Sequence, residues 1–438
     1  MKKQFAVHRL VTLTSTIGFI SFTSHALASG FQLWEQDGAS VGDYHAGRAA
    51  IAEDASTNFY NPAGLVRIHN QQFVVGAVPI LTNFIYKGTV AVNTLGDEPV
   101  PVTDQGGGFN LVPDLHYAAP INENLVFGFS IVAPFGLKTD YGYTTNLRYA
   151  ATLTSLQVID AAPSLGFALN DHLSLGAGLD VERASSEFDL VATAFDSSLD
   201  TDAEAKGWST ALGYHLGAMY QFSEQTRIGI GYQSKVKHDL RGHSTFVGPL
   251  ANDALGGEQY SGNYLTKVTL PATTSLSVFH SLNQQVDIMG TVTYTQWNVF
   301  KEVVMQNVAG IQDGVGNNSI TVFVPENYHN TWNYSVGGNL HVNSQFFLRA
   351  GVGYDQSPAN DVDRNVELPD GDRVAVAFGG HYQATKTVGF DLGWTHFFQL
   401  NPSINNVVQP VGDQVTTTNG SVNTNADVYG LQVKWDIT

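Results

Sequence analysis

The strongest constraint on this chain is a repeated segment type in which every second residue is apolar. In 387–398 the residues of one face are Val388, Phe390, Leu392 and Trp394, and the other face is small or polar. The same alternation recurs in three further segments: 226–237, 346–355 and 428–435. Side chains of a β-strand point to opposite faces in turn, so this period predicts strands with one apolar side.

The linkers between these segments alternate between short and long. Short ones include Asn170-Asp171 and Asn283-Gln284, whereas 243–262 and 300–328 are far longer. We expect fourteen strands, near 71–86, 109–119, 125–132, 153–169, 172–190, 206–222, 226–242, 263–282, 285–299, 329–342, 345–354, 372–382, 387–398 and 426–435. An even strand count with short turns at one end and long loops at the other is typical of an outer-membrane β-barrel. A soluble β-sandwich has no reason to keep this rhythm.

No apolar run after residue 28 is long enough for a membrane helix. If the chain lies in a membrane, its strands must therefore close into a barrel, because an open sheet leaves unpaired backbone groups in lipid. The first residues look like an export signal, with Lys2, Lys3 and Arg9 before an apolar stretch and a cleavage site at Ala26-Leu27-Ala28. An N-terminal membrane helix is the weaker alternative.

The segment 29–70 lacks the strand period. It contains a short helical stretch, 47–55, and ends near Asn61-Pro62-Ala63, which breaks a helix. We therefore expect three parts: a signal peptide at 1–28, a small helical segment at 29–70 and a barrel at 71–438.

Composition excludes several functions. The net charge of −18 argues against nucleic-acid binding, and the absence of cysteine excludes thiol catalysis and thiolate metal sites. Asp361 and Asp363, like Asp370 and Asp372, lack the spacing of a calcium loop and are read as turns. We find no motif of a hydrolase or of a phosphate loop. The sequence predicts no enzyme, no cofactor and no metal.

Short motifs occur in order along the mature chain. They are Ser29-Gly30-Phe31-Gln32-Leu33, Ala52-Glu53-Asp54-Ala55, Asn61-Pro62-Ala63, Pro134-Phe135-Gly136-Leu137-Lys138-Thr139, Leu270-Pro271-Ala272-Thr273, Tyr294-Thr295-Gln296-Trp297, Leu348-Arg349-Ala350-Gly351, Tyr354-Asp355-Gln356-Ser357-Pro358 and Leu368-Pro369-Asp370-Gly371-Asp372-Arg373. Together they resemble the long-chain fatty acid transporters (FadL type) and the related toluene channels. The resemblance implies an all-β transmembrane antiparallel barrel of fourteen strands, with a small helical hatch, 29–70, in its lumen.

The resemblance also implies an inward kink in the third strand, which opens a side exit into the membrane. The candidate strand is 125–132, where Gly128 would allow the kink. Asn61, Pro62 and Ala63 either stop a helix or anchor the hatch against this kinked strand. Phe31 either lines the ligand pocket, as the resemblance implies, or packs the hatch against the wall.

A fatty acid needs apolar walls and a few cations for its carboxylate. The alternation predicts inward-facing cations at Arg227, Lys235, Lys237, Arg349 and Lys434, and Arg183 as a further candidate. Each of them either meets the ligand or forms a salt bridge in the lumen, and Arg349, within a family motif, favours a structural partner. The apolar segment 133–152, with Phe135 and Leu137, is either a landing groove for a hydrophobic ligand or a loop folded over the barrel mouth.

These observations predict a monomeric outer-membrane channel for passive uptake of hydrophobic molecules, most simply long-chain fatty acids, in contact with outer-membrane lipids. The alternatives are a channel for aromatic hydrocarbons and a surface adhesin or structural barrel without transport. An outer-membrane lipase would need a Ser-His pair for which the sequence offers no motif.

Overall fold

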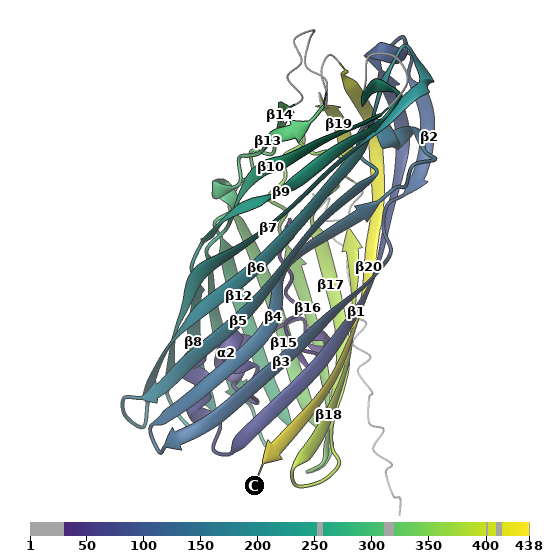
Figure 1. The fold of residues 1–438 in the computed structure, drawn as a ribbon. Coiled ribbons are helices and arrows are strands. Elements are labelled where there is room, and N and C mark those ends of the chain that lie inside the picture. The colour runs from purple at the N-terminus through teal and green to yellow at the C-terminus, as the bar shows by residue number, and fades with distance from the viewer. Residues whose placement is uncertain (1–29, 252–256, 311–318, 400–401, 409–413, 438) are drawn as a thin grey trace, which may run out of the picture.

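The computed structural model describes residues 30–251, 257–310, 319–399, 402–408 and 414–437. The expected signal peptide, 1–28, lies outside the described residues. The described chain forms a tall barrel of tilted strands around a small helical segment (Figure 1). No helix among the described residues is long and apolar enough to cross a membrane.

The barrel is closed, antiparallel and 14-stranded, as the linkers predicted. Its wall consists of β1 (Gln71–Val92), β3 (Phe109–Asn122), β4 (Leu125–Asp140), β5 (Leu153–Ala168), β6 (Leu173–Ala194), β7 (Asp196–Gln221), β8 (Thr226–Gln233) continued by β9 (Val236–Gly248), β10 (Gly257–Leu270) continued by β11 (Thr273–Ser281), β12 (Val286–Thr295), β15 (Thr331–His341), β16 (Phe346–Asp355), β17 (Arg373–Gln383), β18 (Val388–Gln399) and β20 (Thr416–Ile437). Pairing of β1 with β20 closes the ring.

The long connections are not plain loops. They carry β2 (Val100–Gln105), β13 (Glu302–Ala309), β14 (Ser319–Pro325) and β19 (Ser403–Val408), and short 3-10 turns at Asn93–Leu95, Asn146–Tyr149, Pro249–Ala251 and Trp297–Val299. Several wall strands also run on into this end, so β1 and β20 are longer than their predicted apolar cores.

Two predicted strands, 226–242 and 263–282, are each interrupted in the middle. One break follows Gln233 and the other follows Leu270, where Pro271 has no N–H for the ladder. The breaks are side by side, because β9 pairs with β10 and β8 pairs with β11. The inward-facing positions change from odd to even residue numbers between β8 and β9, so Arg227 and Val236 are both buried, and from even to odd between β10 and β11.

The outward face is apolar along most of the wall. In β18, Phe390 and Leu392 are exposed while Asp391 and Thr395 are buried inside the barrel, as the alternation predicted. The exposed apolar side chains of this face have no protein core to cover them, which is the arrangement a lipid environment stabilises.

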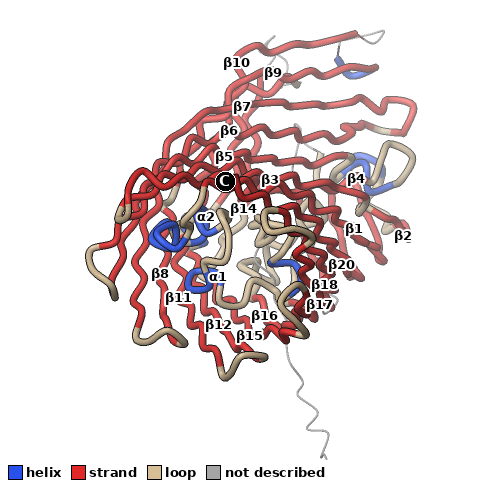
Figure 2. Tube along the Cα trace, turned by 90° about the horizontal axis from the view of Figure 1, so that it is seen from below, coloured by secondary structure: helices blue, strands red, loops and turns tan. Residues whose placement is uncertain are grey.

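The N-terminal segment lies inside the ring of strands, as the view along the barrel shows (Figure 2). Its elements are short: a 3-10 turn at Ser40–Gly42, α1 (Arg48–Ile51), α2 (Thr57–Tyr60) and a second 3-10 turn at Pro62–Arg67. Inward-facing glycines let its backbone approach the wall. A Cβ atom on Gly229 would lie 1.8 Å from the carbonyl oxygen of Ala49, and one on Gly351 would lie 2.0 Å from that of Asp43.

Candidate ligand-binding site

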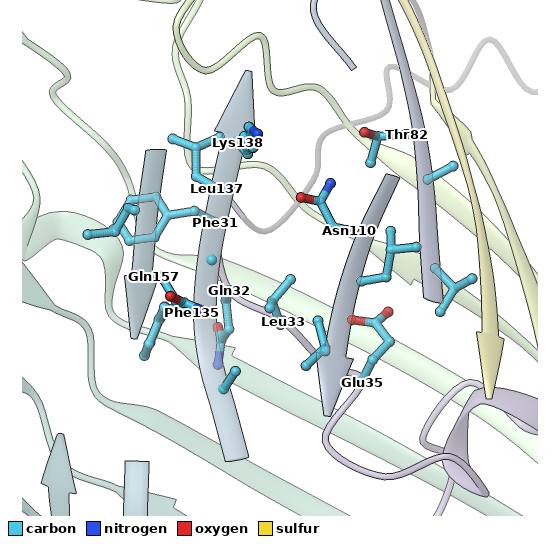
Figure 3. A pocket seen from close by; sticks show the side chains of 18 of the residues that line it. Phe31, Gln32, Leu33, Glu35, Thr82, Asn110, Phe135, Leu137, Lys138 and Gln157 are labelled. Carbon is cyan, nitrogen blue, oxygen red and sulfur yellow. The ribbon is translucent and has the colours of Figure 1, made fainter. Parts of the chain in front are cut away.

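A cavity of about 420 Å³ lies between the N-terminal residues and the wall strands β1, β3, β4 and β5. Phe31, Leu33, Phe135 and Leu137 give it apolar walls, and Lys138 lies at its edge (Figure 3). Its volume is within the range of roughly 300–1,000 Å³ that is usual for small-molecule pockets.

Phe31 packs in the centre of an aromatic cluster beside this cavity. Its ring centroid lies 4.7 Å from that of Trp297, 5.3 Å from that of Phe300 and 6.0 Å from that of Phe135, all edge to face. Edge-to-face rings at these distances attract each other beyond their burial alone. Phe31 thus packs against the wall and lines the cavity at once, and the two readings of this residue do not exclude each other.

The barrel wall is interrupted next to the cavity. The ladder between β3 and β4 stops at the pair Leu115–Ile131, although β4 continues to Asp140. On its other side β4 has an irregular register between Val132 and Phe135, where Pro134 cannot donate to a ladder. This bulge bends β4 away from β3.

The N-terminal residues occupy the place that β3 leaves. Leu33 N donates to Pro134 O at 2.9 Å, and Gly136 N donates to Phe31 O at 2.9 Å. Gln32 and Phe135 therefore face each other as a non-hydrogen-bonded antiparallel pair. The cavity also touches the outer face here, because its lining includes Leu111, Ile131 and Ile159, whose side chains are 54%, 40% and 42% exposed.

The predicted kink at Gly128 is wrong. Gly128 pairs regularly with Ala118 on one side and Ser164 on the other, and the irregularity lies at Ala133 and Pro134 instead. Gly128 permits a different feature, a close approach of the N-terminal segment. A Cβ atom there would lie 2.1 Å from Oδ1 of Asn58.

Asn61, Pro62 and Ala63 both stop a helix and hold the segment to the wall. Asn61 ends α2, and its Nδ2 donates to Ala49 O at 2.6 Å and to Ala218 O of β7 at 3.1 Å. Pro62 and Ala63 pack against three wall glycines: Gly166, Gly176 and Gly217. The anchor is thus on β5, β6 and β7 and not on the kinked strand. A different residue, Asn58, reaches β4, through Ser130 at 2.8 Å.

Buried ion pairs join the N-terminal segment to the opposite wall. Arg349 of β16 contacts Glu53 at 2.6 Å and Asp391 of β18 at 2.8 Å. Arg48 of α1 contacts the same Glu53 at 2.8 Å and Asp43 at 3.1 Å. Arg349 therefore has structural partners, as its motif favoured.

The other predicted cations divide into two groups. Arg227 points inward, and its guanidinium donates to the carbonyl oxygens of Ala50 and Ile51 at 2.6 Å, at the end of α1. Lys434 is also on the inward face and half-buried. The inward placement of Arg183, Lys235 and Lys237 is wrong.

All three misplaced cations are exposed on the outward face. Arg183 shares its side of β6 with Leu179 and Val181, while Asp180 and Glu182 are buried inside. Lys235 and Lys237 follow the break after β8, which reverses the alternation extrapolated from β8.

The segment 133–152 divides into two parts, a strand end that lines the cavity and a buried aromatic cluster, and its role as a landing groove stays a prediction. Phe135 and Leu137 belong to β4 and line the cavity. Tyr141, Leu147 and Tyr149 are buried in a cluster that covers the upper end of the barrel.

The sequence interpretation missed two polar residues of the cavity, although both stand in motifs that it singled out. Lys138 directly follows Leu137 and is exposed. Asp370, in the loop before β17, accepts a hydrogen bond from Gly30 N at 2.9 Å. Burial raises the pKa of Asp370 to about 7, against the opposing effect of Arg373.

Carboxylates that could hold a metal occur away from this cavity. The ligand atoms of Glu187, Asp189 and Glu204 lie within 4.8 Å of one another. Lys206 already contacts two of them, at 3.0 Å from Glu187 and 2.9 Å from Glu204. An ammonium group thus already pairs with two of the three carboxylates.

A closed barrel with an apolar outer face, short turns at one end and a filled lumen defines an outer-membrane β-barrel protein. Residues 19–437 match the family model of the outer membrane protein transport proteins (OMPP1/FadL/TodX). The chain belongs to this family of outer-membrane transport proteins.

Known relatives match over nearly the whole chain. It is 29% identical to an outer membrane protein of Neisseria meningitidis serogroup B, over 98% of each chain. It is 27% identical to the long-chain fatty acid transport protein of Salmonella typhi, over 87% of this chain and 90% of the relative.

Solved structures share the fold. A FadL homologue of Pseudomonas aeruginosa superposes with a TM-score of 0.81 at 23% identity, over 94% of this chain and all (100%) of that one. A toluene transporter of Pseudomonas putida, TodX, superposes with a TM-score of 0.70 at 18% identity, over 92% and 99% of the two chains.

Proposed function

We propose that this protein is a passive channel that takes up long-chain fatty acids and releases them sideways into the outer membrane. The observation that carries the proposal is the apolar cavity, which lies beside an interruption of the wall and includes outward-facing residues in its lining. An apolar ligand that leaves by this route avoids contact with periplasmic water, which favours the lateral path.

In this proposal residues 29–70 act as a hatch with a movable tip. The tip, residues 30–36, pairs with β4 across the gap that the ligand would use. Release of Phe31 from its aromatic partners would connect the cavity with the gap. No energy source is required, because the ligand moves down its concentration gradient.

Uptake of oleate by cells that lack their own transporter tests the function, and a disulfide tests the movement of the tip. The chain has no cysteine, so Gln32→Cys with Phe135→Cys introduces a single possible bridge. Facing residues of a non-hydrogen-bonded pair are about 4.5 Å apart at Cα, within the range of a disulfide. We expect the oxidised variant to lose uptake and dithiothreitol to restore it.

The single variant Phe135→Cys controls for the lost ring, and the reduced double variant controls for the lost contacts of Gln32 with Thr273 and Thr295. Equal uptake by the bridged and reduced double variant, with the bridge verified by mass spectrometry, would refute the movable tip.

A second cross-link separates the lateral route from passage through the lumen. Ala49 N lies 3.2 Å from Ser277 Oγ, so cysteines at these positions can be joined by a short bifunctional thiol reagent. We expect uptake to continue when α1 is tied to β11 in this way. Loss of uptake would mean that the ligand passes the hatch and not the gap in the wall.

Transport of aromatic hydrocarbons is the alternative, favoured by the aromatic cavity wall and by the likeness to a toluene transporter. Lys138 discriminates, because a carboxylate gains from a nearby ammonium and toluene does not. We expect Lys138→Gln to weaken oleate binding by roughly two- to fivefold, the size of an exposed ion pair, and to leave toluene binding unchanged. Lys386→Gln, in a turn at the opposite end, is the matched control.

A further inference from the structure

Four cations on the outer wall have no carboxylate partner among the described residues. They are Arg183 of β6, Lys235 directly before β9, Lys237 of β9 and Lys267 of β10, and all are exposed. Arg183 makes one polar contact, from Nη1 to Thr210 Oγ1 at 3.3 Å. We call these four residues the outer cationic patch.

The strand register brings the patch together. Arg183 lies opposite Thr210 of β7, Lys267 opposite Asp239 of β9, and Lys237 opposite Thr269. The pairing of β7 with β9 ends, on the side of the short turns, at Trp208–Arg241. Thr210 and Asp239 each lie two residues beyond this pair on their own strands, so they are at about the same height. Arg183 and Lys267 are thus separated by about three strand spacings, roughly 14 Å.

The patch begins at the height of an aromatic pair. The rings of Tyr214 and Tyr232 face outward with centroids 6.0 Å apart, and Ser234 N donates to Tyr214 O at 2.9 Å. Lys235 follows directly. Tyrosines of barrels gather at the membrane–water interface, and the short turns mark the periplasmic end. The four cations therefore lie at and just above the outer interface, at the depth of lipid headgroups.

The patch differs from the rest of the outer wall, where nearby cations are paired with carboxylates and several strands carry no cation. Lys206 is paired with Glu187 and Glu204, and Arg241 lies 4.0 Å from Asp239. The sequences of β12, β15 and β18 contain no Lys or Arg. Lys87 of β1 and Lys138 of β4 are also exposed, but each stands alone on its strand, whereas the four patch cations lie on adjacent strands of a protein whose net charge is −18.

We propose that the outer cationic patch binds the phosphate groups of a phosphorylated glycolipid of the outer leaflet, lipopolysaccharide, whose acyl chains lie against the apolar wall below. Each headgroup phosphate is an anion held at the depth of the cations, and guanidinium and ammonium groups are its usual protein partners. Leu179 and Val181 provide apolar surface below Arg183 on the same strand, with exposures of 61% and 39%, and Leu212, 74% exposed, lies level with Lys237 by the register of β7 and β9.

Native mass spectrometry of the detergent-solubilised protein, titrated with bisphosphorylated lipid A, tests the proposal. The variant carries Arg183→Gln, Lys235→Gln, Lys237→Gln and Lys267→Gln. Each basic residue near an anionic lipid surface contributes about 1 kcal/mol, so we expect binding to weaken at least about tenfold. Dephosphorylated lipid A should bind both proteins equally weakly, because it lacks the anions that the patch binds. Free inorganic phosphate at roughly 10 mM should not displace lipid A, which separates a lipid site from a site for free phosphate.

The double variant Lys87→Gln, Lys386→Gln is the control, because it removes exposed cations outside the patch. Only protein that keeps the heat-dependent gel shift of a folded barrel is counted. Equal lipid A affinity of the wild-type and fourfold-substituted protein, or an equal loss in the control, would overturn the proposal. Oleate uptake should be unchanged in the fourfold variant, which keeps this test separate from that of the transport function.

Discussion

The two ends of the N-terminal segment are held inside the barrel by different forces. Residues 37–67 are fixed by buried ion pairs, by side-chain hydrogen bonds and by close contact with wall glycines. Residues 30–36 make no ion pair with the wall closer than 4 Å among the described residues. They are held by two backbone hydrogen bonds to β4, by aromatic packing and by side-chain hydrogen bonds of Gln32, Trp34 and Gln36.

In the function proposed above, this difference makes residues 30–36, and not residues 37–67, the part that moves. We call residues 37–67 the base of the segment. Opening the base would leave buried charges without partners, which costs several kcal/mol, and would open gaps against the wall glycines. Opening the tip exchanges its backbone hydrogen bonds, and the side-chain hydrogen bonds of Gln32, Trp34 and Gln36, for bonds to water. It also exposes Phe31, which an apolar ligand can cover again. A fixed base and a movable tip are what a gate for a hydrophobic molecule requires.

The largest effect should come from removal of Arg349, which lowers the free energy of opening of residues 37–67. Arg349→Met leaves the buried Asp391 without a guanidinium and leaves the half-buried Glu53 with Arg48 alone. We expect the free energy of opening of residues 37–67 to fall by about 3–5 kcal/mol, the usual cost of breaking a buried ion pair. Hydrogen exchange of that segment measures it, and the tip should be much less affected.

Arg241→Met is the matched control, because this exposed arginine lies 4.0 Å from Asp239 on the outer wall. An exposed pair contributes about 0–1 kcal/mol. If both variants changed exchange equally, the base would not depend on its ion pairs.

A smaller effect should come from one added methyl group. In Gly229→Ala the new Cβ would lie 1.8 Å from Ala49 O and 2.9 Å from Asn61 Nδ2, so α1 must shift. Overpacking of this kind costs about 1–3 kcal/mol. Gly290→Ala is the control on a nearby strand, since its Cβ would have only Ser335 O within 4 Å, at 3.4 Å. Equal thermal stability of the two variants would show that the base is not tightly packed.

Much of this architecture could be predicted from the sequence, because the barrel depends on a local rule. Alternation alone placed Asp391 and Arg349 inside and Leu392 outside, and the linkers gave the strand count. The resemblance supplied the helical segment in the lumen. Its contacts with particular strands depend on where inward-facing glycines happen to lie opposite it, and no local pattern records that.

The errors arose where the local rule is interrupted. One break in a strand reverses every later side chain, so Lys235 and Lys237 were assigned to the wrong face. Arg183 is different, because its own strand places it with Leu179 and Val181, and that signal was already present. The kink was placed at Gly128 because glycine is flexible, whereas the bulge is set by Pro134, which cannot donate to the ladder.

The smallest expected effect concerns the polar anchor of the tip. Asp370 accepts from Gly30 N and from Ser357 Oγ, with Arg373 and Asp355 nearby, and burial raises its pKa to about 7. When the tip opens, this pKa falls toward its ordinary value. The closed state therefore holds more protons in the window from about pH 4 to 7, and opening becomes more favourable as the pH rises through that window and levels off above it.

Because Asp370 stays beside Arg373 in both states, we expect a change of only about two- to threefold in the opening equilibrium of residues 30–36 between pH 5 and 8. Asp370→Asn keeps an acceptor for Gly30 N and removes this proton, so its opening should vary less with pH; what remains reports Glu35 of the tip, whose pKa burial also raises. Hydrogen exchange corrected for the intrinsic rate measures both proteins. A wild-type tip that closes more tightly as the pH rises would contradict this account, because ionisation of Asp370 would then stabilise the closed state, and the contact with Gly30 would outweigh the cost of burying the charge.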